Sequence, residues 1–559
     1  MRPGDHGDNI VPLRPRSRRP RRLLPPRRSP VPVDEVRTFS ALVRRAAATA
    51  GDAPALVHRD RRLTWAELDA LVDRAAAGCV SRGLRPGDRI AVQLPNGVDW
   101  VVAVMGALRA GLVVVPVNTA YTGPEVEHLL TDSGAGLLVV VADRPAIAGV
   151  PVCVGPPDAD GPAPADPDDP SALALLAYTS GTTGRPRGAM LTHAALLANQ
   201  HQLLALDPPP VRAGDRVLLV LPLFHVYGFN SGFGLVAATA ACGVVVEEFD
   251  PAATLALMSA EEVSAVVGAP PMYGAWLAVA DAAGSDTVLR RGFAAVRTAS
   301  CGAAPMPGAL FTAMRDRAAV TVWEGYGLTE AAPVLASTLA TGRAKPECIG
   351  GPLPGVELVL RDTAGGPAAG DDPGTRVRPG VFGDPFTGPD GEQDAEEAGE
   401  MCARGPNLFS GYWPDGADGP DAEGWLATGD IAHRDADGDL HLVERRRDLV
   451  LVRGFNVYPG EVERVLGEHP QVVEAAVIGV PDPVTGEAVH AVVVRTAGAT
   501  LTEQELREHA GRSLARFKVP VAVHFVPELP HSLTGKVSRA RLRELGLERA
   551  AAAEAVSGE

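Results

Sequence analysis

The chain has 559 residues, of which 46% are apolar and 21% are charged, and its net charge is −16 at pH 7. This length predicts a large buried core divided between more than one domain. The composition is that of a globular protein, with no secretory signal and no apolar run of the roughly 18 residues that a membrane-spanning helix needs. The acidic charge argues against non-specific nucleic-acid binding.

The distribution of the basic residues and the cysteines gives further predictions, about the N-terminus and about the redox compartment. Residues 1–34 hold nine arginines and many prolines, which predicts a disordered arm. A contact of this arm with nucleic acid or anionic lipid remains open, as does an over-long start of the reading frame. Lysine occurs only at positions 345, 518 and 536. The six cysteines are scattered without a Cys-x-x-Cys pair, which favours a reducing cytoplasm over a disulfide framework or a zinc site.

From about Val36 helical and strand patterns alternate, as is typical of layered α/β domains with parallel sheets. Two Thr-x-x-Glu capping boxes mark helix starts, because each side chain can bond the other residue's backbone amide. The predicted elements are a helix from 64–67 to Val80, a strand at 89–93, a helix at 100–110, a strand at 112–117 and a helix opening at 122–125. Further strands are predicted near 216–221, 243–246 and 265–267.

A loop rich in glycine and hydroxyl side chains follows a strand predicted at 173–177 and precedes a helix predicted at 190–204, with Thr192 as its cap. Such a loop can direct N–H groups and hydroxyls at a polyphosphate, and Arg187 adds fixed positive charge. It is not a Walker A loop, and a plain flexible connection is the alternative. The candidate residues are Tyr178, Thr179, Ser180, Gly181, Thr182, Thr183, Gly184, Arg187 and Gly188.

The last third of the chain changes character. Residues 362–399 are dense in Gly, Pro, Asp and Glu, which predicts a surface insertion, and Asp-Gly-Asp at 437–439 predicts a hairpin turn. A smaller α+β unit follows, with strands at 449–452, 473–479 and 489–494 and a helix opening at 502–505. We therefore predict a first domain over 35–445, a second over 446–546 and a frayed tail over 547–559.

Seven motifs occur in the order in which the adenylate-forming superfamily carries them, and between about Leu63 and Arg541 the chain resembles these acyl-CoA synthetases, luciferases and peptide-synthetase domains. After the loop come Leu-Pro-Leu-Phe-His-Val-Tyr (221–227), Gly-Ala-Ala-Pro (302–305), Gly-Tyr-Gly-Leu-Thr-Glu (325–330), Gly-Trp-Leu-Ala-Thr-Gly-Asp (424–430), Arg-Gly-Phe-Asn-Val-Tyr-Pro (453–459) and Leu-Thr-Gly-Lys (533–536). The resemblance implies an α/β fold: a large N-terminal domain of layered α/β subdomains with a small β-barrel part, and a smaller, mobile C-terminal α+β domain.

The resemblance also implies which residues bind ATP and Mg²⁺. Tyr326 would stack on adenine, Thr329 would bond the α-phosphate, and Asp430 and Arg445 would contact the ribose. Glu330 and Thr182 would ligate Mg²⁺, since hard oxygen donors suit this ion. Arg187 stands where the family usually has lysine, which keeps the charge but changes the reach. The adenine slot would consist of Gly302, Ala303, Ala304, Pro305, Gly325, Tyr326 and Gly327.

Four residues are implied in the chemistry and in the change between its two steps. His225 would border the carboxylate pocket and gate the thiol tunnel. Lys536 would contact carboxylate and phosphate oxygens together, and it is lysine although all but three of the 52 basic residues are arginine. Arg447 would be the hinge of the small domain, and Gly454 would let the pantetheine of CoA reach the acyl-adenylate.

The acyl pocket is predicted to be apolar. Residues 188–193 and 446–463 resemble fatty-acyl-CoA synthetases, whereas 332–335 resemble aromatic-acid CoA ligases. Many ligases for phenolic acids carry a lysine where this chain has Ser300. The candidate substrate-contacting residues are His225, Tyr227, Ser300, Gly327, Pro333 and Val334.

We therefore predict a cytoplasmic enzyme that uses ATP, Mg²⁺ and coenzyme A to convert a medium- or long-chain fatty acid to acyl-AMP and then to acyl-CoA. The alternatives are an aryl-acid CoA ligase, an acyl-AMP ligase that feeds a carrier protein, and a non-catalytic paralogue that binds nucleotide or acyl groups. No nucleic-acid partner and no membrane span are expected, while peripheral membrane contact and a homodimer are left open.

Overall fold

The structure is a computed structural model. The predicted N-terminal arm, the C-terminal tail and residues 362–397 of the predicted insertion lie outside the part that it describes. Residues 444, 445, 451, 455, 456, 461 and 486 are described by their backbone alone. The described residues are 36–179, 186–361, 398–445, 450–452, 455–457, 459–482, 486–514, 516–531, 537–539 and 541–542.

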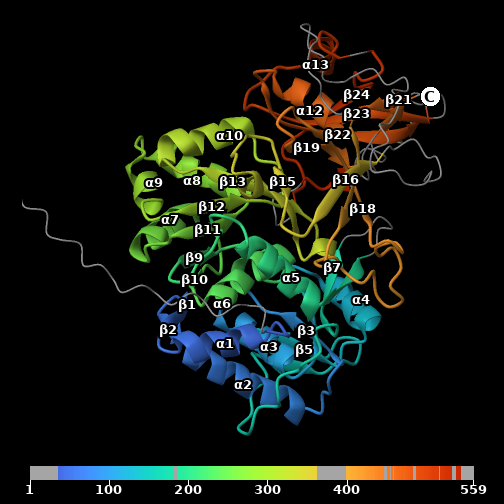
Figure 1. The fold of residues 1–559 in the computed structure, drawn as a ribbon. Helices are drawn as coiled ribbons and strands as arrows, with labels where there is room; N and C mark the ends of the chain where they lie inside the picture. The colour runs from blue at the N-terminus through green and yellow to red at the C-terminus, as the bar shows by residue number, and fades with distance from the viewer. Residues whose placement is uncertain are drawn as a thin grey trace, which may run out of the picture. The chain divides into compact units, whose positions relative to one another are not determined.

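The first sheet has six strands in the order β6-β5-β3-β4-β7-β8, and every pairing except that of β7 with β8 is parallel. Its strands β3, β5 and β7 are labelled in Figure 1. Both predicted capping boxes are confirmed, at Thr64 and Thr122, each with its two reciprocal hydrogen bonds. The elements are α1 Ala41–Ala50, α2 Trp65–Ser81, β3 Arg89–Gln93, α3 Val98–Arg109, β4 Val113–Pro116, α4 Gly123–Ser133, β5 Leu137–Val140, β6 Val152–Val154, β7 Leu173–Thr179, β8 Arg187–Thr192 and α5 His193–Leu204.

The second sheet has nine strands in the order β15-β14-β13-β12-β11-β9-β10-β1-β2. Its middle strands are parallel, and the central strand β11 is apolar and buried along its whole length, because a sheet covered on both faces leaves no side for polar residues. The elements are β1 Pro54–His58, β2 Arg61–Thr64, β9 Arg216–Leu219, α6 Leu235–Thr239, β10 Cys242–Val245, α7 Pro251–Ala260, β11 Ala265–Gly268, α8 Pro270–Ala282, α9 Thr287–Gly292, β12 Thr298–Cys301, α10 Gly308–Ala313, β13 Val322–Gly327, β14 Val334–Ser337, α11 Thr338–Thr341 and β15 Gly351–Pro352. Two π-helical turns, η2 Tyr227–Gly234 and η3 Met314–Ala318, and the 3-10 turn η4 Thr329–Ala331 complete it.

A third sheet is antiparallel, with the order β16-β17-β18-β19. The predicted Asp-Gly-Asp turn is confirmed, since it joins β18 to β19. A fourth sheet, with its own apolar core, forms the smaller α+β unit. The remaining elements are β16 Glu357–Arg361, β17 Gly399–Arg404, β18 Leu426–Arg434, β19 Leu440–Arg445, β20 Val450–Val452, β21 Phe455–Val457, α12 Pro459–Gly467, β22 Val472–Asp482, β23 Gly486–Arg495, α13 Glu503–Ala510 and β24 Ala522–Val526.

One local prediction is wrong. The helix expected over 190–204 begins only at His193, because residues 187–192 form strand β8 and pair with β7. Met190 and Leu191 are buried on this strand, which favours sheet pairing over an exposed first helical turn. Thr192 does cap the helix, accepting from the amide of Ala195. The candidate phosphate loop therefore joins two antiparallel strands.

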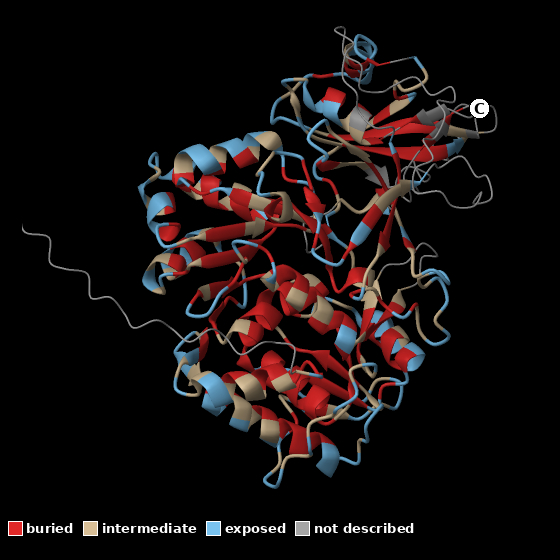
Figure 2. Ribbon diagram, viewed as in Figure 1, coloured by how far each residue is buried: buried red, intermediate tan, exposed pale blue. Residues whose placement is uncertain are grey.

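Buried residues are concentrated on the strands and on the inner sides of their helices (Figure 2). One exception to apolar burial is Arg109 of α3, which is fully buried and pairs with Asp69 at 2.6 Å and Asp73 at 2.7 Å on α2. Arg44 of α1 also contacts Asp73, at 2.8 Å, and lies 2.6 Å from Asp166, which Arg109 approaches at 3.3 Å. Two arginines and three aspartates thus join α1, α2, α3 and a later loop. In the described chain, no helix is long and apolar enough to cross a membrane.

Arg109→Met is expected to lower the free energy of unfolding by about 3–5 kcal/mol, because it removes a fully buried guanidinium and leaves three partly buried carboxylates without that partner. Chemical denaturation measures this. Arg74→Met is the matched control, since Arg74 also joins α2 to the later loop, through Asp158 and Asp160, but is half-exposed. It should cost less than about 1 kcal/mol. Equal losses in the two variants would refute the special role of the buried Arg109.

Candidate active site

Two of the motifs lie at the carboxyl ends of neighbouring parallel strands. Gly302 follows β12 directly, and β13 ends at Gly327, two residues before Thr329. Ligands of α/β sheets bind at this edge. Ala303 has a left-handed backbone, with φ +71°, which costs a residue with a Cβ roughly 1–2 kcal/mol and is typical of sites where the surroundings fix the chain.

Tyr326 and Asp430 are brought together from positions 104 apart in the chain. The Tyr326 hydroxyl donates to Oδ2 of Asp430 at 2.5 Å, and the two residues are 7% and 5% exposed. Asp430 lies on β18 directly opposite Arg445 of β19, whose side chain is outside the described part. The predicted base-stacking ring and the predicted ribose-binding carboxylate are therefore neighbours, as one bound nucleoside requires.

Tyr412, a residue that the sequence analysis missed, contacts both Arg187 and Glu330. The Arg187 guanidinium lies over the Tyr412 ring, 4.1 Å from its centroid, and donates to Asp418 at 2.6 Å. The Tyr412 hydroxyl donates to Oε1 of Glu330. Burial and the Glu330 charge raise the pKa of this hydroxyl well above its usual value, so it stays protonated as a donor. The predicted phosphate-binding cation thus contacts the ring face of Tyr412, and the predicted metal ligand contacts its hydroxyl.

The strand β8 positions these groups. Trp413 N donates to the Gly188 carbonyl at 2.8 Å, Met190 N donates to Gly411, and Phe409 N donates to the Glu330 carbonyl at 2.8 Å. Residues 409–413 therefore bridge β8 and the η4 turn. The sequence Gly-Tyr-Trp at 411–413 was the available signal, because an aromatic pair beside a glycine in a polar stretch often marks a contact surface.

At the start of the loop, Thr179 pairs with Arg187, and Tyr178 donates to Asp132 at 2.6 Å. Burial, together with this bond, raises the pKa of Tyr178 well above its usual value. An added Cβ at Gly188 would lie 3.2 Å from the Tyr178 ring, so glycine lets the ring pack on the strand. Ser180, Gly181, Thr182, Thr183 and Gly184 lie outside the described residues.

The candidate acyl-contacting residues gather around the ends of β11 and β12. Tyr227 is half-buried, and its ring would meet an added Cβ at Gly302 at 3.1 Å; its hydroxyl donates to Gly268 at 3.4 Å. Ser300 offers its carbonyl to the hydroxyl of the buried Tyr273, at 2.8 Å. His225 Nδ1 accepts from the amide of Tyr227 at 3.3 Å.

Gly327 and the segment after Glu330 pack against each other. An added Cβ at Gly327 would lie 1.9 Å from the Pro333 carbonyl oxygen, so only glycine fits. The buried Val334 pairs with Gly327 across β13 and β14. Pro333 and Val334 thus lie beside the adenine-slot motif, and one short segment connects the nucleotide and acyl parts of the site.

Glu324 is a further residue that the sequence analysis missed. It is 4% exposed, its Oε1 accepts from the amide of Met306 at 3.2 Å, and its Oε2 meets no hydrogen-bond donor among the described residues. Burial raises its pKa to about 8, so the carboxyl is mostly neutral at pH 7. It lies behind Gly302–Pro305, where a protonated carboxyl can act as a donor. Its place directly before Gly325 was the only signal in the sequence.

The residues present fit a hard divalent cation, because Glu330, in the η4 turn just after β13, supplies the carboxylate oxygens that such an ion prefers. Glu330, with Thr182, would hold Mg²⁺, which would neutralise phosphate charge. Lys536, Arg447 and Gly454 lie outside the described residues, so their predicted roles stay predictions.

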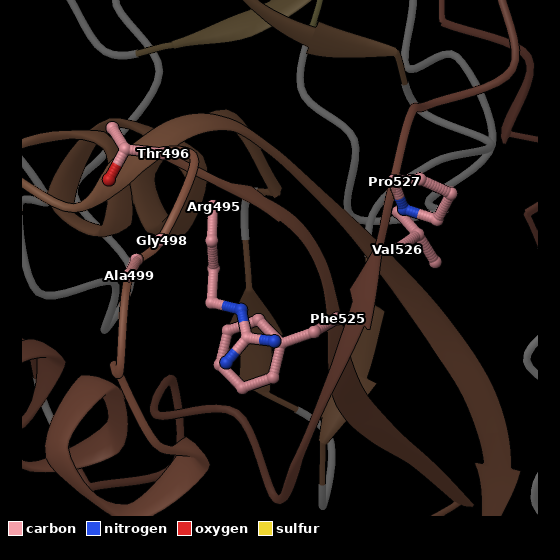
Figure 3. A pocket seen from close by; sticks show the side chains of 7 residues that line it. All are labelled: Arg495, Thr496, Gly498, Ala499, Phe525, Val526 and Pro527. Carbon is pink, nitrogen blue, oxygen red and sulfur yellow. The ribbon is translucent and has the colours of Figure 1, made fainter.

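A separate hollow lies on the smaller unit and does not include any of the predicted site residues (Figure 3). Arg495 lies over the Phe525 ring, 4.1 Å from its centroid, and donates to the Leu501 carbonyl. The hollow has a volume of about 350 Å³. These contacts fix the arginine against its own unit.

Comparisons with known proteins agree with this geometry. The family model of AMP-binding enzymes matches residues 43–413, and that of the AMP-binding enzyme C-terminal domain matches 461–536. The boundary predicted at 445/446 falls between these ranges and stays a prediction. A feruloyl-CoA synthase of Amycolatopsis sp is 37% identical over 88% of this chain and 95% of its own length. A long-chain-fatty-acid–CoA ligase of Yersinia pestis is 32% identical over 92% and 96%. ATP-bound MatB from Rhodopseudomonas palustris matches in structure with a TM-score of 0.78, at 31% identity, over 90% and 98%.

Proposed function

Because the chain belongs to the family of AMP-binding enzymes, we propose that it activates a carboxylic acid with an apolar acyl group and transfers it to coenzyme A. It is an AMP-forming acid–thiol ligase that uses ATP, Mg²⁺ and CoA. A carboxylate oxygen attacks the α-phosphorus of ATP and pyrophosphate leaves; the CoA sulfur then attacks the acyl carbonyl and AMP leaves. Oxide is a poor leaving group, so the adenylate is what makes the second step feasible.

The placement of Tyr326 and Glu330 at the end of β13, with Asp430 of β18 hydrogen-bonded to Tyr326, carries this proposal. In this arrangement Tyr326 stacks on adenine, Asp430 accepts from the ribose hydroxyls, and Arg187 holds the outer phosphates. Phosphoryl and nucleotidyl transfer depend mainly on positioning and on charge stabilisation. The two tyrosine hydroxyls have different roles: that of Tyr326 orients Asp430, and that of Tyr412 orients Glu330.

We propose a medium- or long-chain fatty acid as the substrate class. The candidate pocket segment is apolar, with Ala331, Ala332, Val334 and Leu335 all buried, and Ser300 gives no positive charge for a phenolate. A pocket of this kind gains about 0.8 kcal/mol for each methylene that it buries. A cytoplasmic location belongs to the proposal too, since all six cysteines are buried and none is paired in a disulfide.

A second candidate is an aromatic acid of about the length of a cinnamate. Tyr227 lies against Gly302, Tyr273 lies against Gly268, and both hydroxyls are bonded to backbone carbonyls. Two rings held in this way would give a short acyl pocket with flat walls, which suits an aromatic acid. The similarity to a feruloyl-CoA synthase supports this candidate.

A panel of acids decides between the two. We expect kcat/KM for acyl-CoA formation, measured by mass spectrometry, to rise about fourfold per methylene from butanoate upward until the pocket ends. Ferulate, cinnamate and benzoate are the comparison acids, at the same ATP, Mg²⁺ and CoA concentrations. A higher kcat/KM for the aromatic acids than for octanoate and longer acids would overturn the fatty-acid proposal in favour of the second candidate.

A further inference from the structure

Five amide side chains are buried behind the candidate site. Asparagine and glutamine are mostly exposed in proteins, and burying their polar groups is costly unless each is hydrogen-bonded. All five are at most 5% exposed. This amide cluster consists of Asn199, Gln200 and Gln202 on α5, Asn230 on η2, and Asn407.

The amide cluster is hydrogen-bonded to the backbone of one short stretch, residues 331–334. Asn407 Nδ2 donates to the Ala331 carbonyl at 2.7 Å, and Asn230 Nδ2 donates to the Ala332 carbonyl at 2.5 Å. Asn199 donates to the Val334 carbonyl at 2.8 Å and accepts from the Val334 amide at 3.2 Å. Three carbonyls and one amide of a four-residue segment are therefore bonded to side chains.

The backbone of residues 331–334 includes a strained residue, which these hydrogen bonds stabilise. Ala332 is left-handed, with φ +62°, which costs a residue with a Cβ roughly 1–2 kcal/mol. Strained residues persist where the surroundings over-determine them, and they are frequent at functional sites. The strain is adjacent to the η4 turn that carries Glu330, and it precedes Pro333 and Val334 of the candidate acyl pocket.

The amides also fix one another. Gln202 donates to Oδ1 of Asn407 at 3.1 Å, and Asn199 donates to Oε1 of Gln202 at 3.0 Å. Gln200 donates to Asn230. The Asn407, Gln202 and Asn199 bonds form a chain from the 405–409 loop to α5. Because α5 follows the phosphate-loop hairpin and η2 follows His225, the amide cluster connects these two motifs to the same stretch.

We propose that Asn407, Asn199 and Asn230 are positioning residues for adenylate formation, an inference that rests on the proposed function. They act through the 331–334 backbone and not by contact with substrate. Glu330 precedes Ala332 in the chain, and Pro333 and Val334 follow it. By fixing this backbone, the three asparagines hold the metal-binding carboxylate in a constant position relative to the acyl pocket. Removing these hydrogen bonds lowers the rate of adenylation even in molecules that are fully folded.

The test compares two buried-amide truncations. Asn407→Ala removes the donors to Ala331 and, at 3.2 Å, to Val334. Gln93→Ala is the matched control, because Gln93 is buried and donates to the Asn118 carbonyl at 3.0 Å but belongs to no motif. Adenylation is followed as acid-dependent pyrophosphate release per folded molecule, with the folded fraction taken from thermal unfolding. Asn199→Ser is the second variant if Asn407→Ala does not fold.

We expect Asn407→Ala to lower kcat for adenylation about 10–100-fold, with KM for ATP changed by less than about threefold, the pattern of an interaction needed mainly in the transition state. Gln93→Ala should keep the wild-type kcat. A wild-type kcat per folded Asn407→Ala molecule, or an equal loss in Gln93→Ala, would overturn the inference. If the wild type releases no pyrophosphate with any acid of the panel, the proposed function fails, and this inference fails with it.

Discussion

Lys536→Ala is expected to slow adenylate formation by roughly 10²–10³-fold, the scale of losing one preorganised electrostatic contact. By the family resemblance its ammonium contacts the carboxylate and the α-phosphate together, so it stabilises charge that develops only in this step. Thioester formation from supplied acyl-adenylate should change much less. The two half-reactions are assayed separately on the same preparation.

Two further variants sharpen this test. Lys518→Ala removes another of the three lysines and should leave both half-reactions at wild-type rates. Lys536→Arg keeps the charge but replaces a slim ammonium by a planar guanidinium, so it should restore only part of the rate. Equal losses in adenylation and thioester formation for Lys536→Ala would rule out this division of labour.

Arg447→Pro is expected to abolish acyl-CoA production while leaving acid-dependent pyrophosphate release largely intact. Lys536 and Gly454 both lie in the predicted second domain and serve successive steps, so this domain must rotate between them. The hinge has to absorb a large change in φ and ψ. Proline fixes φ near −65° and should lock one conformation.

Arg447→Ala is the control for the hinge, because it removes the same guanidinium but leaves the backbone able to rotate. It should keep most acyl-CoA production. A wild-type rate of acyl-CoA production in Arg447→Pro would place the pivot elsewhere, and a block in both variants would assign the effect to the lost charge.

The sequence predicted the elements with a strong local signal. The capping boxes at Thr64 and Thr122 and the turn at 437–439 need only neighbouring residues to form, and all three are present. The strand β8 was mistaken for the start of a helix because its residues are apolar at a spacing that fits either element. Only its pairing with β7, a tertiary contact, decides between them.

The motif residues could be found from the sequence, but their partners could not. Nothing near Tyr326 indicates that its hydroxyl bonds Asp430, and nothing near Arg187 indicates that it stacks on Tyr412. Asn407 and Asn199 look like ordinary polar residues of a loop and a helix. Their importance comes from burial beside a strained backbone, which depends on how three separate segments pack.

The central claim is that an acyl-adenylate forms by attack of the carboxylate on the α-phosphorus of ATP. An acid labelled with oxygen-18 in its carboxyl group tests this directly, with ATP, Mg²⁺, CoA and the best acid of the panel. If the claim holds, the AMP released with acyl-CoA carries one heavy oxygen atom, because one carboxylate oxygen stays on the phosphorus when the thiol attacks. AMP without the label, or ADP and phosphate as the products, would contradict it.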